Sequence, residues 1–298
     1  MYNIVSKLII YGDMDKDSIL MKLSDIIRKY KETDYKKDEI ITELYCQVKR
    51  ILEVSTDYGF DDNLWHNYLT YLLITDENPF SLTCEKIGAN NGSVNHFAEN
   101  DFKQFKALFD YDFTSIDCFK KLSNYKAIGK PELMYNKNVS EKVRTLSKKL
   151  EQSKDEKEFF EHVTNFYKDY GVGMFGLNKA FRITDTVPFK FHAINNMDKV
   201  MLDDLVGYEI QKKKLVDNTE AFVEGRKANN CLLFGDSGTG KSTSIKAIVN
   251  QYYDKGLRMI EIYKHQFKDL SNVIAAIKNR NYKFIIYMDD LSFEEFEI

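Results

Sequence analysis

Apolar residues recur at intervals of three or four through much of the first part of the chain, the spacing of one face of an α-helix. The pattern predicts helices over residues 19–30, 41–52, 64–73, 93–109, 140–152 and 155–169. The third helix should stop before Asn78-Pro79, since the residue before proline disfavours helical backbone. Ser93 is a candidate cap for the fourth helix. We therefore predict a helical N-terminal domain over residues 1–170.

Aromatic residues such as Phe97, Phe102, Phe105 and Phe109 share a helical spacing. We expect them to pack in the core of the helical domain, because a platform that stacks nucleic-acid bases is the rarer use of such residues. The segment "GVGMFG" at 171–176 fits the dinucleotide-binding pattern G-x-G-x-x-G. It follows a charged, helix-like stretch where that pattern requires a strand. We interpret it as a glycine-rich turn that begins a linker over residues 171–198.

The pattern changes after about residue 196, where short apolar runs alternate with helical stretches. Strands are predicted for "CLLF" (231–234), "LRMIEIY" (257–263) and "KFIIYM" (283–288), and a helix for 268–279. Gly256 is a plausible helix end. Alternation of strands and helices predicts a parallel sheet with helices on both faces. The fold class expected for the chain is α + α/β, with a partial three-layer parallel sheet over residues 199–298.

Residues 235–242, "GDSGTGKS", match the phosphate-binding pattern G-x-x-x-x-G-K-[ST] in full, between a predicted strand and a predicted helix. Glycines let the backbone curl so that its N–H groups and the start of the helix face a phosphate. Lys241 should reach the β- and γ-phosphates of a nucleotide, and Ser242 should give its hydroxyl to Mg²⁺. A glycine-rich turn without a nucleotide is the alternative. The residues expected to surround the phosphates are Gly235, Asp236, Ser237, Gly238, Thr239, Gly240, Lys241, Ser242 and Thr243, with Asp236 better explained as a surface residue.

Two aspartates follow the last predicted strand, at the edge where ligands gather in open α/β sheets. Asp289 is the candidate acid that holds Mg²⁺, and Asp290 the candidate base that polarises water. An aspartate at a strand end by chance is the alternative for Asp289, and Glu294 or Glu295 could replace Asp290 as the base. Catalytic roles are thus predicted for Lys241 and Asp290, and metal binding for Ser242 and Asp289.

Composition narrows the class of protein without deciding its function. The net charge is -3, with acidic and basic residues interleaved, so nucleic acid is not indicated as a partner. No run approaches the roughly 20 apolar residues of a membrane span. The four cysteines are far apart and form no C-x-x-C pair, which fits a reducing, cytoplasmic environment.

The segment "LDDLVGYEIQKKKLVDNTEAFVEGRKANN" (202–230) resembles the entry segment of AAA+ ATPases, in which "DD-x-VG" precedes the phosphate loop. That resemblance implies an adenine pocket at Val206, Gly207 and Tyr208; an ordinary turn is the alternative. Together with "FIIYMDDLSFE", the region resembles an uncharacterised bacterial family of AAA+ proteins, catalogued as ATP-binding with a domain of unknown function. The resemblance implies that the intact protein binds ATP and Mg²⁺ and forms homo-oligomers. It also implies that ATP hydrolysis drives remodelling of an unknown partner, which in such proteins is a protein or a nucleic acid.

Two other functions stay open. A small-molecule phosphotransferase also uses such a phosphate loop, and a nucleotide-binding interaction module would use it without turnover. A GTPase fits poorly, since Ser292 stands where D-x-x-G requires glycine after Asp289. AAA+ cores have the strand order 5-1-4-3-2, and only strands 1, 2 and 3 are assigned here. We therefore expect a truncated catalytic domain that hydrolyses ATP slowly at most.

Overall fold

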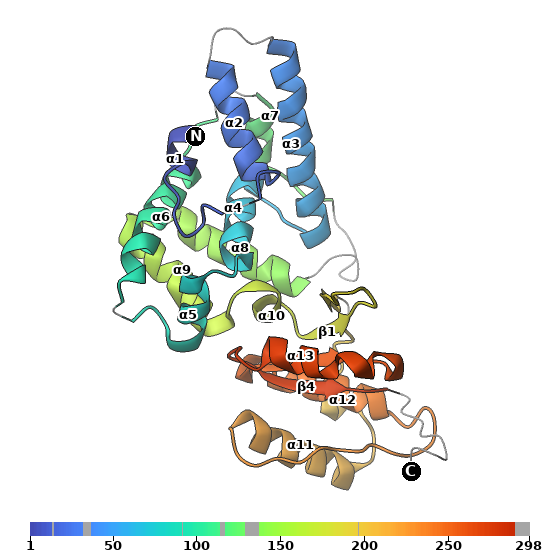
Figure 1. Ribbon diagram of the computed structural model, residues 1–298. Coiled ribbons are helices and arrows are strands. Elements are labelled where there is room, and N and C mark those ends of the chain that lie inside the picture. The colour runs from blue at the N-terminus through green and yellow to red at the C-terminus, as the bar shows by residue number, and fades with distance from the viewer. Residues whose placement is uncertain are drawn as a thin grey trace. The chain divides into compact units, whose positions relative to one another are not determined.

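The computed structural model describes residues 1–13, 15–31, 37–90, 92–113, 117–128, 137–195 and 197–289. The chain divides into two compact units, Met1–Leu177 and Asn178–Ile298. The first unit is helical, and the second contains a small mixed sheet with helices (Figure 1). A helical unit followed by an α/β unit is the fold class that the sequence predicts.

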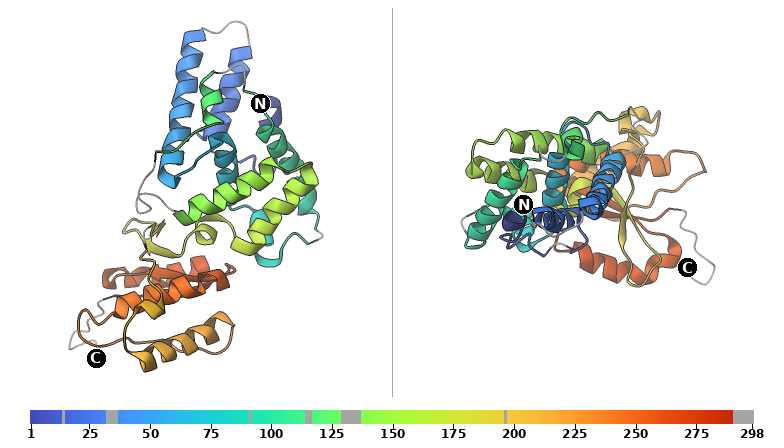
Figure 2. Two further views of the ribbon diagram at one scale, coloured as in Figure 1. Left: turned by 180° about the vertical axis from the view of Figure 1, so that it is seen from behind. Right: turned by 90° about the horizontal axis from the view of Figure 1, so that it is seen from above.

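The first unit is built from helices, and the longer ones other than Pro79–Ile87 lie over the segments predicted by the apolar spacing. Its elements are α1 (Tyr2–Val5), α2 (Ile19–Lys31), α3 (Lys37–Tyr58), α4 (Leu64–Thr75), α5 (Pro79–Ile87), α6 (Val94–Phe109), α7 (Asp117–Leu122), α8 (Lys137–Glu151), α9 (Glu156–Tyr170) and α10 (Gly173–Leu177). Helices α2 and α3 lie side by side in both views (Figures 1 and 2).

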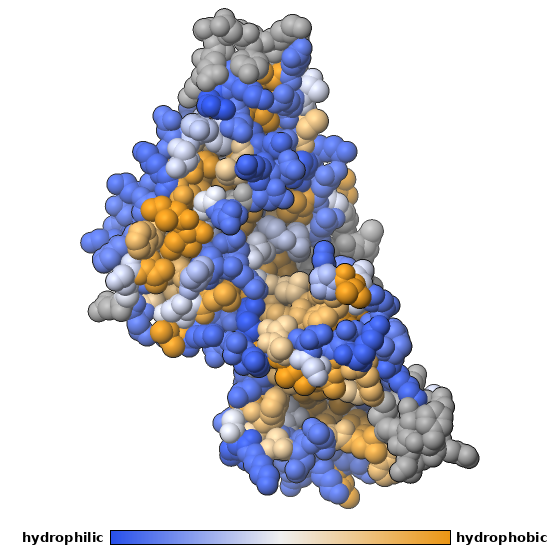
Figure 3. All heavy atoms as spheres, viewed as in Figure 1, coloured by the Kyte–Doolittle hydropathy of each residue, from blue (hydrophilic) through white to orange (hydrophobic). Residues whose placement is uncertain are grey.

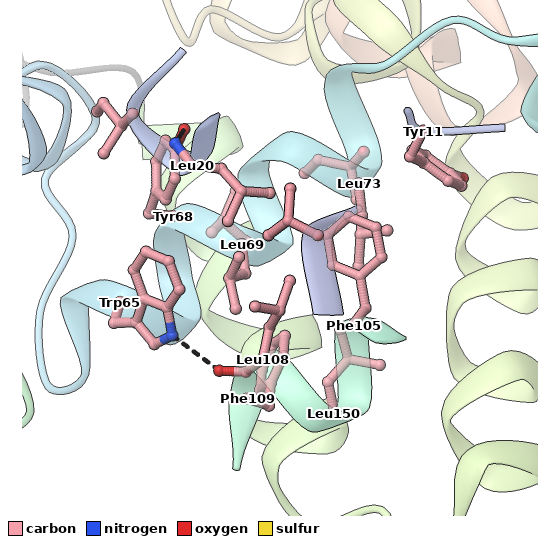
Figure 4. Packing of buried hydrophobic residues seen from close by; sticks show 14 of the residues in the cluster. Tyr11, Leu20, Trp65, Tyr68, Leu69, Leu73, Phe105, Leu108, Phe109 and Leu150 are labelled. Carbon is pink, nitrogen blue, oxygen red and sulfur yellow. Dashed lines mark hydrogen bonds between the residues drawn. The ribbon is translucent and has the colours of Figure 1, made fainter. Parts of the chain in front are cut away.

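Aromatic side chains fill much of the core of this unit. Phe102 and Phe105 are fully buried and Phe109 nearly so, which confirms their predicted packing role. Phe97 is half exposed and lies outside that core, because it falls on the other side of α6. Trp65 is buried and donates its indole N–H to the Leu108 carbonyl at 2.9 Å (Figure 4). That bond gives a partner to one of the orphan carbonyls at the end of α6.

Side chains cap several helices. Asn78 and Ser81 form a reciprocal capping box at the start of α5, with Pro79 in its first turn. Asp155 accepts hydrogen bonds from two backbone N–H groups at the start of α9. Ser93 precedes α6 without a side-chain capping bond, so the predicted cap is present only in position.

The segment before α2 is fixed to the helices by one buried carboxylate. Both Asp101 oxygens accept hydrogen bonds from the backbone N–H groups of residues 9–11, at 2.7–3.0 Å. The Tyr11 hydroxyl then lies 2.7 Å from that of Tyr167, which donates to the Leu73 carbonyl at 2.6 Å. This chain of polar contacts crosses the core without leaving these groups unpaired.

The second unit contains a four-stranded mixed sheet in the order β2-β1-β3-β4. Its elements are β1 (Ala180–Ile183), β2 (Phe191–Ala193), the 3-10 turn η2 (Leu202–Asp204), α11 (Glu209–Val223), α12 (Lys241–Tyr252), η3 (Tyr253–Lys255), β3 (Leu257–Glu261), η4 (Lys264–Asp269), α13 (Leu270–Ile277) and β4 (Lys283–Tyr287). Strand β1 pairs antiparallel with β2 and parallel with β3, and β3 pairs parallel with β4. Figure 1 shows α13 on one side of the sheet and α12 with α11 on the other.

Two sequence predictions are corrected in this unit. Residues 180–183 and 191–193 form strands, although the sequence placed them in a linker. Residues 231–234, predicted as a strand, pair with none of the described strands. Leu232 and Phe234 are 73% and 88% exposed, so the apolar run lacks the neighbours that a buried strand needs. Figure 3 shows that apolar residues also lie at the surface among hydrophilic ones on the face that it draws.

The face of the sheet under α12 changes character toward the carboxyl ends of the parallel strands. Met259 and Ile285, in register on β3 and β4, pack in the core beneath α12. Two positions further along, side chains on the same face are polar: Arg182, Glu261 and Tyr287 form an in-register row across β1, β3 and β4. The sheet therefore presents polar groups at the end where α12 begins.

Candidate functional site

The loop over residues 235–240 leads directly into α12. Gly235, Gly238 and Gly240 have φ values of 141°, 78° and 82°, a region that residues with a Cβ rarely adopt. The loop thus favours glycine at all three positions, two of which, 235 and 240, are the glycines that the phosphate-binding pattern specifies. Gly240 occupies the position before α12, whose first N–H groups have no helical acceptor.

Lys241 is folded back over this loop. Its ammonium donates to the Gly235 carbonyl at 2.9 Å and to the Asp236 carbonyl at 2.7 Å. The Thr239 hydroxyl donates to the same Asp236 carbonyl at 2.8 Å. A positive charge is therefore held inside the loop, beside the helix N-terminus, where an anion would meet both.

Ser242 and Asp289 are brought together although they lie 47 positions apart in the sequence. The Ser242 hydroxyl lies 3.2 Å from Asp289 Oδ1 and 3.1 Å from Oδ2. Asp289 follows β4 at the carboxyl end of the sheet and is exposed. The structure thus pairs the two residues that the sequence predicted as metal ligands.

Tyr287 is a member of this site that the sequence interpretation missed. Its half-buried side chain lies at the end of β4, two positions before Asp289. Burial raises the pKa of Tyr287, and the neighbouring Asp289 and Glu261 carboxylates raise it further, while the Ser242 contact lowers it. The sequence contained a signal for Tyr287, because residues two apart on a strand share a face. Tyr287 and Asp289 would lie on the same face if the extended backbone of β4 continued to residue 289.

The predicted adenine-binding residues lie next to the loop along an exposed turn. Val206 is 94% exposed, and Gly207 and Tyr208 both have positive φ values of 84° and 59°. Just before them, the Leu205 side chain lies 3.6 Å from the point where a Cβ on Gly240 would stand. The entry segment and the phosphate loop are therefore neighbours. Leu205 lies near Gly240, and the next residue, Val206, is exposed to solvent.

Of the remaining predicted site residues, some lie on the loop or in α12 and others lie outside the described residues. Asp236 and Ser237 are exposed on the loop, and Thr243 is half-buried in the first turn of α12. Asp290, the predicted catalytic base, lies outside the described residues, as do Glu294 and Glu295.

The first unit contains a cavity of about 240 Å³. It is lined by Asn63, Trp65, His66, Phe109, Asp110, Tyr111, Asp112, Phe113, Lys120 and Ser123. Several of its polar groups already have partners: His66 Nε2 lies 2.9 Å from the Phe109 carbonyl, and Asp110 pairs with Lys106 at 2.7 Å. These contacts hold the end of α6 in place. We therefore place the candidate functional site at the loop 235–240 of the second unit, where the predicted site residues meet.

The model of a protein family described as "Protein of unknown function (DUF815)" matches residues 177–298. The match covers the whole second unit and confirms a resemblance to an uncharacterised family there. No curated protein and no solved structure matches the chain. Within the part of the chain that the structure describes, no helix is both long and apolar enough to cross a membrane.

Proposed function

We propose that the second unit binds ATP together with Mg²⁺ through the loop 235–240, the start of α12 and Asp289. The observation that carries this proposal is the contact of Ser242 with both Asp289 oxygens, at 3.2 and 3.1 Å. A serine after a glycine-rich loop and an aspartate after a parallel strand are the pair that phosphate-binding loops use for the metal. Chance similarity of the loop sequence would not bring that aspartate to that serine.

The donor set fits Mg²⁺. Hydroxyl and carboxylate oxygens are ligands that this ion accepts, directly or through its water shell. Ligand oxygens about 2.0–2.1 Å from an octahedral ion lie about 2.9 Å from their nearest neighbours. The separation of Ser242 Oγ from the Asp289 oxygens is close to that value. When held by Ser242 and Asp289, the ion would neutralise negative charge on the phosphates.

The protein's own groups account for phosphate binding. The loop glycines hold the backbone in a curled form, and α12 directs unpaired N–H groups toward an anion. Lys241 would exchange its two carbonyl contacts for phosphate oxygens. Val206, Gly207 and Tyr208, beside the loop, would cover the adenine.

We further propose that this nucleotide site belongs to an AAA+ ATPase that remodels a protein partner as a homo-oligomer. In the order 5-1-4-3-2, strand 2 neighbours strand 3, as β3 neighbours β4. This neighbouring pair supports the topology, as does the turn before α11 beside the phosphate loop.

Calorimetric titration of the chain with ATP tests the proposal, in Mg²⁺ and then in EDTA. We expect binding that Mg²⁺ strengthens and that Lys241→Ala weakens by about tenfold or more, because a charged hydrogen-bond donor to phosphate is lost. The matched control is Lys246→Ala, since Lys246 lies on the same helix but pairs with Asp198 at 2.8 Å. Equal affinity of wild type and Lys241→Ala would rule the site out. Phosphate release without an added acceptor would favour an ATPase over a phosphotransferase, and ATP binding with no release would indicate an interaction module.

A further inference from the structure

The turn over residues 205–208, between η2 and α11, presents apolar side chains to solvent in an unusual backbone form. Val206 is 94% exposed and Tyr208 is 56% exposed. Gly207 and Tyr208 both have positive φ values, and for Tyr208 this left-handed conformation is unfavourable because the residue has a Cβ. Such a conformation persists only where neighbouring groups hold it.

Lys212, in the first turn of α11, is bonded to both ends of this turn. Its ammonium donates to the Leu205 carbonyl at 2.8 Å, and its backbone N–H donates to the Tyr208 carbonyl at 2.8 Å. The ammonium also pairs with Glu209 at 2.7 Å. The Lys212 side chain is only 14% exposed, although lysine usually keeps its charged end in water. Lys212 therefore closes the turn through one side-chain contact and one backbone contact.

The end of the turn that the ammonium holds lies against the phosphate loop. Leu205 is half-buried, packs against the apolar core beside α12 and lies 3.6 Å from the point where a Cβ on Gly240 would stand. A methionine at position 212 would fill the space of the lysine stem, but it has no donor for the Leu205 carbonyl. The ammonium, rather than the packing of the stem, is therefore what ties this end of the turn to α11.

We propose that Lys212 is a positioning residue for the nucleoside part of the ligand: its ammonium holds the turn 205–208 in the form in which residues 206–208 meet the base. This inference rests on the proposed function and adds a residue to which the phosphate-binding pattern assigns no role. Lys212 acts through the turn and not on the ligand. Its loss should reduce the fraction of molecules whose turn is ready to bind, and so weaken a ligand with a nucleoside more than a bare triphosphate.

The experiment compares wild type with Lys212→Met by calorimetric titration with ATP and with inorganic tripolyphosphate, both in Mg²⁺, alongside thermal unfolding without ligand. The variant should bind ATP about 5- to 20-fold more weakly and tripolyphosphate within about 2-fold of wild type. Loss of a positive charge near the phosphates affects both ligands, so the ratio of the two dissociation constants reports the turn. The matched control is Lys213→Met, which removes the same charge from the next, exposed position of α11 and should leave the ratio unchanged.

Equal weakening of ATP and tripolyphosphate would overturn the inference, because it would show a general effect on the fold, and so would no weakening of either ligand. If Lys212→Met does not fold, Gly207→Ala decides the question. No atom lies within 4 Å of the place where its Cβ would stand, but the φ of 84° disfavours a Cβ, so the change should disturb the turn alone. ATP binding should then weaken about 3- to 10-fold relative to tripolyphosphate binding, and an unchanged ratio overturns the inference.

The two proposals can fail separately. An unchanged ATP affinity in Lys241→Ala removes the proposed function and this inference together. A normal loss in Lys241→Ala with an unchanged ratio in Lys212→Met removes only the role of Lys212.

Discussion

Asp289→Asn separates the charge of this side chain from its shape. The amide keeps one oxygen that can accept the Ser242 hydroxyl, now 3.1–3.2 Å from both carboxylate oxygens. The geometry of the loop should therefore survive, and Lys241 keeps its own contacts with the loop carbonyls. What disappears is one negative charge at the place where we propose the metal.

The charge has opposite effects with and without the metal. In EDTA, the exposed carboxylate repels a triphosphate through water, by about 1 kcal/mol at 4 Å per pair of unit charges, and salt reduces this further. Asparagine should therefore strengthen ATP binding in EDTA by about 5-fold at most. In Mg²⁺, the loss of a charge-assisted contact with the ion or its water shell costs about 1.5–3 kcal/mol, or about 10- to 150-fold in affinity.

The assay is the ratio of ATP dissociation constants in EDTA and in Mg²⁺. Asp289→Asn should reduce that ratio by at least about tenfold, because both effects act in the same direction. Asp236→Asn is the matched control: it removes the same charge from an exposed position on the phosphate loop, and it keeps the backbone carbonyl that accepts from Thr239 and Lys241. A ratio in Asp289→Asn equal to that of wild type would refute the assignment of Asp289 to the metal.

Three further predictions concern stability. Asp101→Asn should lower the free energy of unfolding by about 2–5 kcal/mol in denaturant titrations, because one oxygen replaces two acceptors for three backbone N–H groups, that of Tyr11 buried and the other two partly buried; a loss below about 0.5 kcal/mol would contradict this. Arg258→Lys should cost about 1–3 kcal/mol in the same assay, since Arg258 is 3% exposed between the rings of Tyr253 and Tyr282, where an ammonium cannot stack; full stability would contradict the stacking argument. Burial lowers the pKa of His66 in the folded protein. Below about pH 6.5 this residue therefore binds more protons in the unfolded protein than in the folded one, and the free energy of unfolding should fall as pH drops from 7 to 5. The stability difference between wild type and His66→Gln should narrow over that range, and a constant difference would show that His66 does not contribute.

The sequence predicted best where a pattern is local. Helical spacing placed α2, α3, α4, α6, α8 and α9, because the side chains that define each face are neighbours within one or two turns. The pattern over 231–234 was as apolar as that of β4, yet only β4 is a strand. A strand depends on hydrogen bonds with another segment, and no local property of "CLLF" reports whether that neighbour is present. For the same reason the sequence did not predict β1 and β2. Both strands are short, β2 pairs with β1, and β1 also pairs with β3, which lies more than 60 residues away.

The candidate site divides in the same way. Glycine at 235, 238 and 240 could be predicted because the backbone angles there depend only on the absence of a Cβ. The approach of Asp289 to Ser242 could be predicted only through the expectation of a parallel sheet, which aligns the ends of its strands beside the helix start. Alternation along a strand could relate Tyr287 to Asp289, but the alignment of Tyr287 with Glu261 and Arg182 depends on the register of three strands, which no pattern near residue 287 reports.

The two halves of the site differ in what must change when a ligand arrives. The backbone of the loop already has the curled form, so binding costs little conformational entropy there. Lys241 must give up two carbonyl contacts at 2.9 and 2.7 Å before it can reach a phosphate, and that exchange offsets part of what the phosphate supplies. A ligand that touches only the loop regains little beyond those two contacts. A ligand that also extends to Ser242 and Asp289 gains the metal contacts as well, and these replace nothing except the bond between the two side chains. The proposed site would therefore favour a polyphosphate with a bound cation over a single phosphate, because Lys241 must first give up the contacts with its own loop.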